Sequence, residues 1–395
     1  MTKLSIKDLD LQGKKVLMRV DFNVPINLDG TIGDDTRIRL ALPSIEYVLS
    51  RGGKLILMSH FGRPEGKADP KLSLKPCAIH LSKLLGKDVL FVSDCIGENA
   101  KISAEKIRPG EAILLENLRF HEGEEHPEKD PEFAKKLSLL GDLYVNDAFG
   151  AAHRSHASIT AITEYFPKTS SMGFLMEKEV AFLSQLVLDP KHPFYAIIGG
   201  AKIGTKLGVL KSLIKKIDAI FIGGGMAFTF LKGEGVSIGD SICDHEKIDA
   251  AQNLLKKCDQ KGVRLYLPID LVITDGHKIK TVLTIEGIPD GWKGMDVGPK
   301  TIEKWSMVLQ KGSTIFWNGP LGVFEQESFS NGTNQLAQNL STMSGIVIAG
   351  GGDSIAAINA LGLGKKFNHL STGGGASLEY IEHGHLPGID ALTSK

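Results

Sequence analysis

Short apolar runs recur along the 395-residue chain, and most of them end in glycine or in a cluster of polar residues. A strand with one solvated face alternates apolar and polar residues, and these runs do not. They are typical of parallel strands that are buried on both faces of a sheet. The clearest runs are residues 16–20, 54–58, 112–115, 143–145, 195–198, 219–222, 264–267, 314–317 and 345–349.

Segments with helical character separate these runs, for example residues 35–53, 73–86 and 205–217. Alternating strands and helices indicate βαβ units, and therefore an α/β fold with doubly wound, Rossmann-like parallel sheets. In such sheets ligands bind beyond the carboxyl ends of the strands. We therefore expect function in the loops that follow the apolar runs.

The length of the chain and the contents of these loops predict two domains. A chain of 395 residues is too long for one ordinary core. Loops of the first half carry Arg, His, Asp and Asn, whereas those of the second half carry glycine triplets, two lysines and an Asp. We predict an N-terminal domain at 1–171, a helical hinge at 172–188, a C-terminal domain at 189–380 and a separate terminal segment at 381–395.

Charge and composition exclude several classes of protein. The 46 basic and 46 acidic residues cancel, so no overall field attracts nucleic acid or an anionic membrane. No apolar run approaches the ~20 residues of a membrane span, and the first ten residues lack the apolar core of a signal peptide. Cys77, Cys95, Cys243 and Cys258 form neither a CxxC pair nor a zinc spacing, so we expect reduced structural thiols in a cytoplasmic protein.

A group of basic side chains marks the first half of the chain: Arg37, His60, Arg63, Arg119 and Arg154. All except Arg37 fall in or just after a strand-end loop, and Arg37 lies at a probable helix start. Arginine is suited to forked contacts with phosphate and carboxylate, so a converging set would bind a small multivalent anion. Each arginine alone can equally be a solvated surface charge.

The first strand runs directly into Asp21 and Asn23. Both side chains could bind hydroxyl groups of a ligand. Asp21 could as easily cap the next turn.

Residues 199–206 open a predicted helix with glycines and two lysines. Glycines let a backbone approach phosphate closely, and a helix N-terminus favours negative charge. The segment is not a Walker A loop, and no glycine cluster completes G-x-G-x-x-G. Lys202 and Lys206 are spaced i, i+4, so on a helix they would face the same way and could share an anion. The alternative is a basic, exposed helix end.

Four further loops of the second half suit parts of a nucleotide. Residues 223–228 offer bare backbone beside apolar side chains, which suits a purine, and Glu325 could accept ribose hydroxyls. Asp353 stands beside Ser354 at a predicted helix start, where it could hold Mg²⁺ or simply cap the helix. Residues 371–375 precede another short helix and repeat the anion-binding pattern.

In this order, the loops resemble those of the phosphoglycerate kinase family. The matching motifs span almost the whole chain and include VDFNVP (20–25), SHFGRP (59–64), NDAFGAAHR (146–154), GGGMAFTFLK (223–232), WNGPLGVFE (317–325) and STGGGASLEY (371–380). The resemblance implies a monomeric glycolytic and gluconeogenic kinase that transfers phosphate reversibly between ATP and the carboxylate of 3-phosphoglycerate, with Mg²⁺. It also implies that the terminal segment returns to the first domain, and it implies no nucleic-acid or membrane partner.

The resemblance further implies three groups of site residues. The substrate 3-phosphoglycerate or 1,3-bisphosphoglycerate would be held by Asp21, Phe22, Asn23, Arg37, His60, Phe61, Gly62, Arg63, Arg119 and Arg154. The nucleotide would be bound by Lys206, Gly223, Gly224, Phe228, Gly294, Met295, Glu325, Gly351, Gly352, Asp353 and Ser354, with Asp353 on Mg²⁺. The transferred phosphoryl group would be met by Arg37, Lys202, Lys206, Gly373 and Gly374.

Three positions depart from the family pattern, because Thr205 replaces the usual Asp, Ser354 the usual Thr and Ser155 the usual Ala. None removes a residue assigned to chemistry, although Thr205 leaves the charge balance around the two lysines open. A dehydrogenase would need the missing dinucleotide fingerprint. A periplasmic anion-binding protein would need a signal peptide, and an inactive kinase homologue would have lost charged residues that this chain keeps.

The predicted chemistry needs no general base, since a carboxylate nucleophile is already ionised at neutral pH. It needs charge compensation and in-line alignment of a phosphoryl group. Because the two ligands are assigned to different domains, the sequence also predicts a hinge motion that closes the domains and excludes water.

Overall fold

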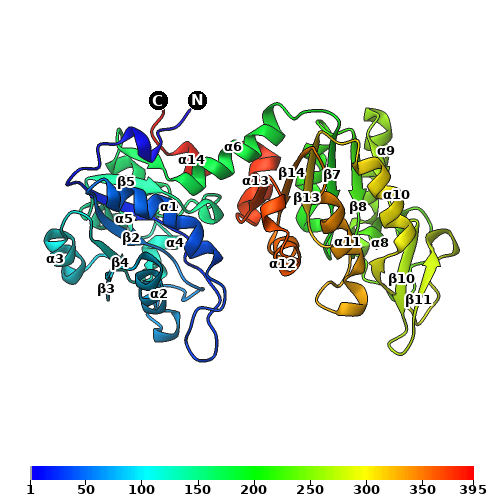
Figure 1. Ribbon diagram of the computed structural model, residues 1–395, viewed down its shortest axis with the longest axis horizontal. Coiled ribbons are helices and arrows are strands. Elements are labelled where there is room, and N and C mark those ends of the chain that lie inside the picture. The colour runs from blue at the N-terminus through cyan, green and yellow to red at the C-terminus, as the bar shows by residue number, and fades with distance from the viewer. Residues whose placement is uncertain (1) are drawn as a thin grey trace. The chain divides into compact units, whose positions relative to one another are not determined.

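The computed structural model describes residues 2–395, and its internal contacts divide the chain into two units (Figure 1). Unit 1 runs up to Ala181 and also includes His385–Lys395, and unit 2 is Phe182–Gly384. The division falls inside helix α6, Phe174–Leu188, which nearly coincides with the helix predicted at 172–188. The two-domain α/β fold class is confirmed. The domain boundaries, the ligand assigned to each domain and the hinge motion stay predictions.

Unit 1 is built on one six-stranded, wholly parallel sheet. Across the sheet the strands are β3 Val89–Val92, β4 Ala112–Leu115, β2 Lys54–Met58, β1 Lys15–Arg19, β5 Leu143–Asn146 and β6 Ser170–Met172. Its helices are α1 Thr36–Ser50, α2 Lys75–Leu85, α3 Glu98–Lys106, α4 Glu122–Glu125, α5 Pro131–Ser138, the start of α6, and α14 Pro387–Asp390.

Unit 2 repeats this architecture with a second parallel sheet and adds a small antiparallel one. The parallel strands, in spatial order, are β15 His369–Ser371, β14 Ile346–Gly350, β13 Thr314–Asn318, β7 Phe194–Ile198, β8 Ala219–Ile222 and β9 Arg264–Tyr266. The antiparallel strands are β11 Ile279–Leu283, β10 Asp270–Thr274 and β12 Lys293–Val297. The helices are α7 Leu207–Leu213, α8 Met226–Gly233, α9 Ile248–Lys261, α10 Pro299–Leu309, α11 Asn331–Leu340, α12 Gly352–Ala360 and α13 Gly375–His383.

Both parallel sheets are buried on their two faces, which explains the continuous apolar runs of the sequence. In unit 1 one core joins alternate residues of β1 and β2, such as Val16 and Leu55, to α1 and α2. In unit 2 the corresponding core joins Ile197 and Trp317 to α10, α11 and α12. Residues that point to the opposite face, such as Leu17, are also fully buried. The nine predicted runs all become strands with nearly the predicted limits.

The sequence analysis did not find β3, β6, β15 or the antiparallel sheet. Strand β3 exposes Leu90, β6 and β15 have three residues each, and β11 is mostly exposed. Such strands lack the apolar run by which buried parallel strands are recognised. Among residues 2–395, no helix has both the length and the apolar character needed to cross a bilayer.

The final residues of the chain pack into unit 1 beside its first ones. The Leu4 amide donates to the carbonyl of Thr393 (2.9 Å), and the Gly388 amide donates to the carbonyl of Ala152 (2.8 Å). The Asn146 side chain at the end of β5 donates to the carbonyl of Gly388 (3.3 Å). These contacts anchor the terminal segment to the edge of the sheet where the predicted substrate loops lie.

Candidate functional site

Strands β1 and β5 are neighbours in the unit 1 sheet. The chain goes from β1 to β2 on one side, whereas β5 begins the other side, so the carboxyl edge between β1 and β5 is the topological switch point. Asp21 and Asn23 follow β1 at this edge. Arg37 donates from Nη1 to Asp21 Oδ2 at 2.8 Å, and Asn23 Oδ1 accepts from the Gly62 amide at 3.0 Å. The structure therefore joins the loop after β1, the start of α1 and the loop after β2.

The predicted arginines of unit 1 differ in how they are held. Arg119 is largely buried, because its side chain is 11 % exposed, and its Nη1 donates to the carbonyl of Gly62 at 2.7 Å. Glu125 lies 3.2 Å from its Nε. Arg63 and Arg154 are exposed. The charge of Arg154 acts on Arg119, so these two lie within electrostatic range of each other.

His60 is buried close to Arg119. Its place among arginines suggests a positively charged histidine, but the structure indicates a neutral one. Arg19 Nη2 lies 3.1 Å from His60 Nδ1. Because a guanidinium can only donate, Nδ1 accepts and the ring proton belongs on Nε2. Burial, followed by the charges of Arg19 and Arg119, holds the pKa of His60 well below its usual value of 6.5. His60 is thus a neutral hydrogen-bond donor at physiological pH.

Arg19 itself was missed by the sequence analysis, because it lies inside an apolar strand and looks like one charged residue in a core segment. It is fully buried, and its Nε donates to Ser158 Oγ at 2.9 Å. Ser158 in turn donates to Glu124 Oε1 at 2.6 Å, and Glu124 lies 3.9 Å from Arg19. Burial raises the pKa of Glu124, and the charge of Arg19 opposes that shift. This buried network holds the Arg19 side chain in place, and Arg19 in turn orients the His60 ring.

In unit 2 the switch point lies between β7 and β13. The order of the six parallel strands on either side of it is the order found in dinucleotide-binding sheets. Lys206 Nζ donates to two backbone carbonyls at the ends of these strands, that of Gly199 just after β7 (2.6 Å) and that of Asn318, the last residue of β13 (3.1 Å). Burial lowers the pKa of Lys206 to about 8, although the charge of Asp353 opposes this shift. Gly319 has φ +98°, and a Cβ there would come within 2.5 Å of both Gly199 O and Lys206 Nζ.

The two lysines do not share a helix face, so this part of the sequence analysis was wrong. Lys202 is exposed and precedes any helix, whereas Lys206 closes a 3₁₀ turn, Gly204–Lys206, and α7 begins only at Leu207. From this turn Lys206 points back to the strand edge, where its Nζ donates to the carbonyls of Gly199 and Asn318. Thr205, where the family usually has Asp, donates from Oγ1 to the carbonyl of Lys202 at 3.3 Å.

A cavity of about 390 Å³ opens beside this edge and collects many of the predicted nucleotide residues. Its wall combines glycine backbone with apolar side chains, and Gly294 lies flat against Phe228, since a Cβ there would come within 2.1 Å of the ring. Buried Asp296 also lines it, and burial raises the pKa of this carboxyl to about 7. The predicted residues that line the cavity are Gly224, Phe228, Gly294, Met295, Glu325 and Asp353.

Helix α12 presents its N-terminus and Asp353 at the end of β14. The Ncap is Gly351, with φ +93°, and no side chain caps the helix. Asp353 is exposed in the first turn, so the alternative that it serves as N-cap is wrong. Ser354 is fully buried and accepts from the Gly319 amide at 2.7 Å, which ties α12 to the loop after β13.

The predicted Gly373–Gly374 pair lies just before α13, and Gly374 is the Ncap with φ +54°. Gly223 follows β8, and a Cβ there would come within 2.5 Å of Leu321, which lines the cavity. Both loops therefore lie at carboxyl ends of parallel strands; this was predicted for Gly223, whereas the strand before Gly373 was not predicted.

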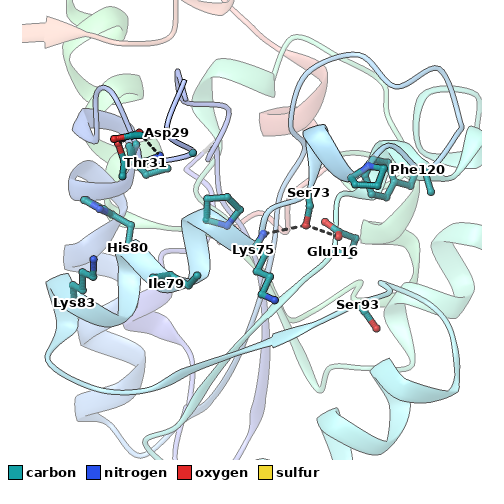
Figure 2. Close-up of a pocket in the computed structure, with 15 residues that line it drawn as sticks. Asp29, Thr31, Ser73, Lys75, Ile79, His80, Lys83, Ser93, Glu116 and Phe120 are labelled. Atoms are coloured by element: carbon teal, nitrogen blue, oxygen red, sulfur yellow. Dashed lines mark hydrogen bonds between the residues drawn. The ribbon is translucent and has the colours of Figure 1, made fainter. Parts of the chain in front are cut away.

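A larger cavity of about 710 Å³ lies elsewhere in unit 1, beside α2, and none of the predicted substrate residues lines it (Figure 2). Lys75, Ile79 and Lys83 face it from one side of α2. Glu116 on its wall is engaged by Ser73 (2.7 Å) and the Leu74 amide (2.9 Å). The larger of these two cavities is therefore not the one lined by residues that the sequence analysis predicted for ligand binding.

A sheet edge with several arginines in one parallel-sheet unit and a glycine-walled cavity beside a half-buried lysine in the other are features of α/β phosphotransferases. The family model described as Phosphoglycerate kinase matches residues 6–384. The chain belongs to the phosphoglycerate kinase family.

Relatives and solved structures agree with this assignment. The chain is 48% identical over 398 residues to phosphoglycerate kinase of Moorella thermoacetica and 47% identical over 399 residues to that of Pseudothermotoga lettingae, with 100% of each chain covered. The structure of phosphoglycerate kinase from Coxiella burnetii is 39% identical with a TM-score of 0.88, and 98% of each chain is covered. The protein is thus a kinase that carries out the glycolytic, ATP-dependent phosphoryl transfer with 3-phosphoglycerate.

Proposed function

We propose that unit 1 binds 3-phosphoglycerate at the β1–β5 edge and that unit 2 binds ATP or ADP at the β7–β13 edge. The proposal rests on the position of Lys206, which is half-buried at the switch point beside a cavity lined by Phe228, Gly294 and Glu325. A buried lysine with a lowered pKa gains most from an anion, because a phosphate replaces the water that burial removed.

The transfer itself rests on charge and alignment. The substrate carboxylate attacks the terminal phosphoryl group without any base to ionise it, since it carries a negative charge at neutral pH. Lys202, Lys206 and Arg37 compensate the charge of the group in transfer, together with the N-terminus of α13 after Gly374. Each preorganised donor of this kind is worth roughly 3–4 kcal/mol, and alignment contributes up to ~7–11 kcal/mol.

The substrate side of the site combines charged and neutral donors. Arg119 and Arg37 are held by Gly62 and Asp21, so both guanidiniums are oriented before substrate arrives. Neutral His60 donates from Nε2 without adding another positive charge to a crowded cluster. Exposed Arg63 and Arg154 complete the electrostatic attraction for a small anion.

Asp353 fits the role of a Mg²⁺ ligand. Its carboxylate is exposed in the first turn of α12, does not cap that helix and lines the proposed nucleotide cavity. Oxygen ligands of this kind suit Mg²⁺, which would neutralise nucleotide phosphate charge when bound. We further propose that the protein is a cytoplasmic monomer without nucleic-acid or membrane partners. The zero net charge supports only the absence of those two kinds of partner.

Domain closure is the motion that this division of ligands requires. The proposed substrate residues belong to unit 1 and the proposed nucleotide residues to unit 2, so transfer requires the two bound ligands to meet. We expect small-angle X-ray scattering to show a smaller radius of gyration with 3-phosphoglycerate and Mg-ADP together than with either alone. An unchanged radius with both ligands bound would refute closure.

The pH dependence of nucleotide affinity should follow Lys206. Below pH 8 the free lysine is charged and causes no change in affinity, whereas above its pKa of about 8 binding must take up a proton. We expect the affinity for ADP to fall about tenfold between pH 7 and pH 9, since one pKa unit is about 1.36 kcal/mol. Titration calorimetry in buffers of different ionisation enthalpy measures both the affinity and the proton uptake.

The matched control is Lys206→Arg, because arginine stays charged over this range. Its affinity for ADP should be nearly independent of pH from 7 to 9, whatever its absolute value. An equally steep fall in this variant would assign the pH dependence to another group.

A further inference from the structure

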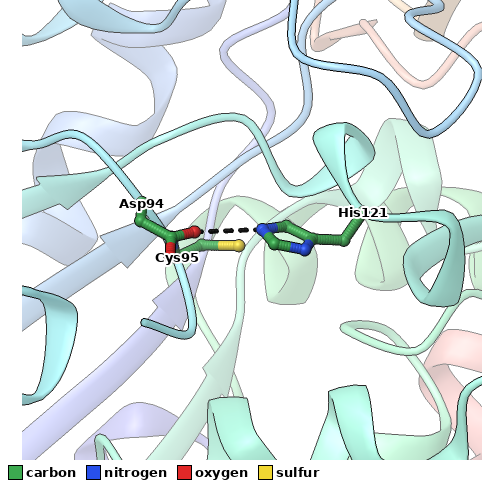
Figure 3. Close-up of side chains that lie close together, drawn as sticks. All are labelled: Asp94, Cys95 and His121. Atoms are coloured by element: carbon green, nitrogen blue, oxygen red, sulfur yellow. Dashed lines mark hydrogen bonds and ion pairs between the residues drawn. The ribbon is translucent and has the colours of Figure 1, made fainter. Parts of the chain in front are cut away.

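Three side chains with metal-binding atoms converge in unit 1, and none of them is assigned to the kinase reaction. They are Asp94, Cys95 and His121, and one ligand atom from each lies within 4.8 Å of the other two (Figure 3). Asp94 and Cys95 belong to the loop between β3 and α3, and His121 lies where α4 begins. Among residues 2–395 this is the one such group of three.

The local structure holds these side chains in place. His121 Nε2 lies 3.0 Å from Asp94 Oδ1, and the His121 ring packs on Phe133 with centroids 5.3 Å apart. The Cys95 amide donates to Asp94 Oδ1 at 2.7 Å. Gly97 leaves room for the carboxylate, because a Cβ there would come within 2.2 Å of Asp94 Oδ2. Figure 3 shows the Cys95 sulfur and the Asp94 carboxylate both directed at the imidazole.

Access and charge favour a cation over a larger ligand. The Cys95 residue is 1 % exposed, so an organic substrate cannot reach its sulfur, while the Asp94 and His121 side chains are 36 % and 32 % exposed. The Asp94 carboxylate supplies a negative charge close to the sulfur. A small ion can therefore enter between the carboxylate and the imidazole and meet the thiol behind them.

We propose that Asp94, Cys95 and His121 form a binding site for Zn²⁺ or a cation of the same borderline-soft class. A thiolate, an imidazole and a carboxylate are the three ligand types that Zn²⁺ uses, and a fourth, open position would be filled by water. Mg²⁺ demands oxygen ligands and does not suit a sulfur atom. The site is therefore distinct in chemistry from the one proposed at Asp353.

The geometry needs only a modest contraction. Tetrahedral zinc with bonds of about 2.0–2.3 Å places its ligand atoms roughly 3.3–3.7 Å apart. Separations of up to 4.8 Å would therefore shorten by about 1 Å at most, while the 3.0 Å between His121 Nε2 and Asp94 Oδ1 would widen slightly. On binding, the Cys95 thiol loses its proton to solvent, and His121 coordinates through the Nε2 lone pair with its proton on Nδ1. The hydrogen bond between His121 and Asp94 is replaced by two bonds to the ion.

Cobalt provides the direct test, because Co²⁺ occupies zinc sites and its bond to a thiolate absorbs in the near ultraviolet. The full chain, freed of metal with a chelator, is titrated with Co²⁺ while absorbance is recorded. We expect a thiolate-to-cobalt band that saturates at one ion per chain. Zn²⁺ should abolish it, and a large excess of Mg²⁺ should leave it in place.

Matched variants assign the band to these residues. Cys95→Ser should remove it, and His121→Asn should weaken Co²⁺ affinity by more than about 100-fold, since loss of an outer-shell partner alone costs 10–100-fold. Cys243→Ser, which alters a half-buried thiol of unit 2, should retain the band with unchanged affinity. Far-ultraviolet circular dichroism checks that each variant is folded.

Absence of the band in the folded wild-type chain would overturn the proposal, and so would its persistence in Cys95→Ser. If Cys95→Ser does not fold, His121→Asn decides, because unchanged Co²⁺ affinity in that variant also overturns the site. Kinase activity does not enter the readout, so the result is independent of the roles proposed for Lys202 and Lys206.

Discussion

Replacement of Lys202 by alanine is expected to lower kcat by about 10²–10³-fold and to change the affinity for ADP only slightly. The reason is that one preorganised donor to a developing charge contributes about 2.7–4 kcal/mol to the transition state. Lys202 is exposed and lies outside the residues that line the proposed nucleotide cavity, so it contributes little to the ground-state complex. A coupled assay of 3-phosphoglycerate phosphorylation gives kcat, and calorimetry gives the affinity.

Lys211→Ala is the matched control, because Lys211 is an exposed lysine of α7 a short distance along the chain. It should keep kcat within about twofold, since surface substitutions away from special features change free energies by about 0.5 kcal/mol or less. A Lys202→Ala enzyme with wild-type kcat would remove this lysine from the mechanism. A variant that lost affinity and kcat in equal measure would make it a binding residue.

Arg19→Met is expected to destabilise the protein by about 3–5 kcal/mol, because it leaves Glu124 buried without its counter-charge. Arg19 and Glu124 are both fully buried, and Ser158 hydrogen-bonds to each of them. The methionine keeps most of the volume, so loss of packing adds little. Urea unfolding without ligands, at pH 7, measures the change in the free energy of unfolding.

Two further variants show whether the effect comes from the buried charge. Arg39→Met breaks an exposed pair with Asp35, in which Arg39 is 58 % exposed, and should change stability by only about 0–1 kcal/mol. Arg19→Met combined with Glu124→Gln should recover part of the lost stability, because no charge is then left unpaired. Equal destabilisation by the Arg19 and Arg39 variants would contradict the buried-network interpretation.

The core of each sheet could be predicted from the sequence because burial on two faces leaves a local pattern. Runs such as 112–115 and 219–222 coincide with β4 and β8, residue for residue. The sequence of β11, by contrast, contains no continuous apolar run, because most of its side chains are exposed. Short or exposed strands are set by pairing with neighbours, and no local pattern records that pairing.

The candidate site divides in the same way. The residue types in the strand-end loops pointed to anion and nucleotide binding, and the topology places those loops at the switch points. Periodicity failed for Lys202 and Lys206, because helical spacing has no meaning where the chain turns before the helix begins. Arg19 was overlooked because nothing next to it in sequence reveals Glu124 and Ser158.

The sequence by itself determined the α/β class, the central strands, the loops that carry chemistry and the family, because each of these follows from local pattern or motif order. Only the tertiary structure decided which tautomer His60 adopts, why Lys206 has a lowered pKa, and that Cys95 meets His121. Those properties depend on burial and on side chains distant in the chain, and desolvation and pairing of that kind exist only once the chain has folded.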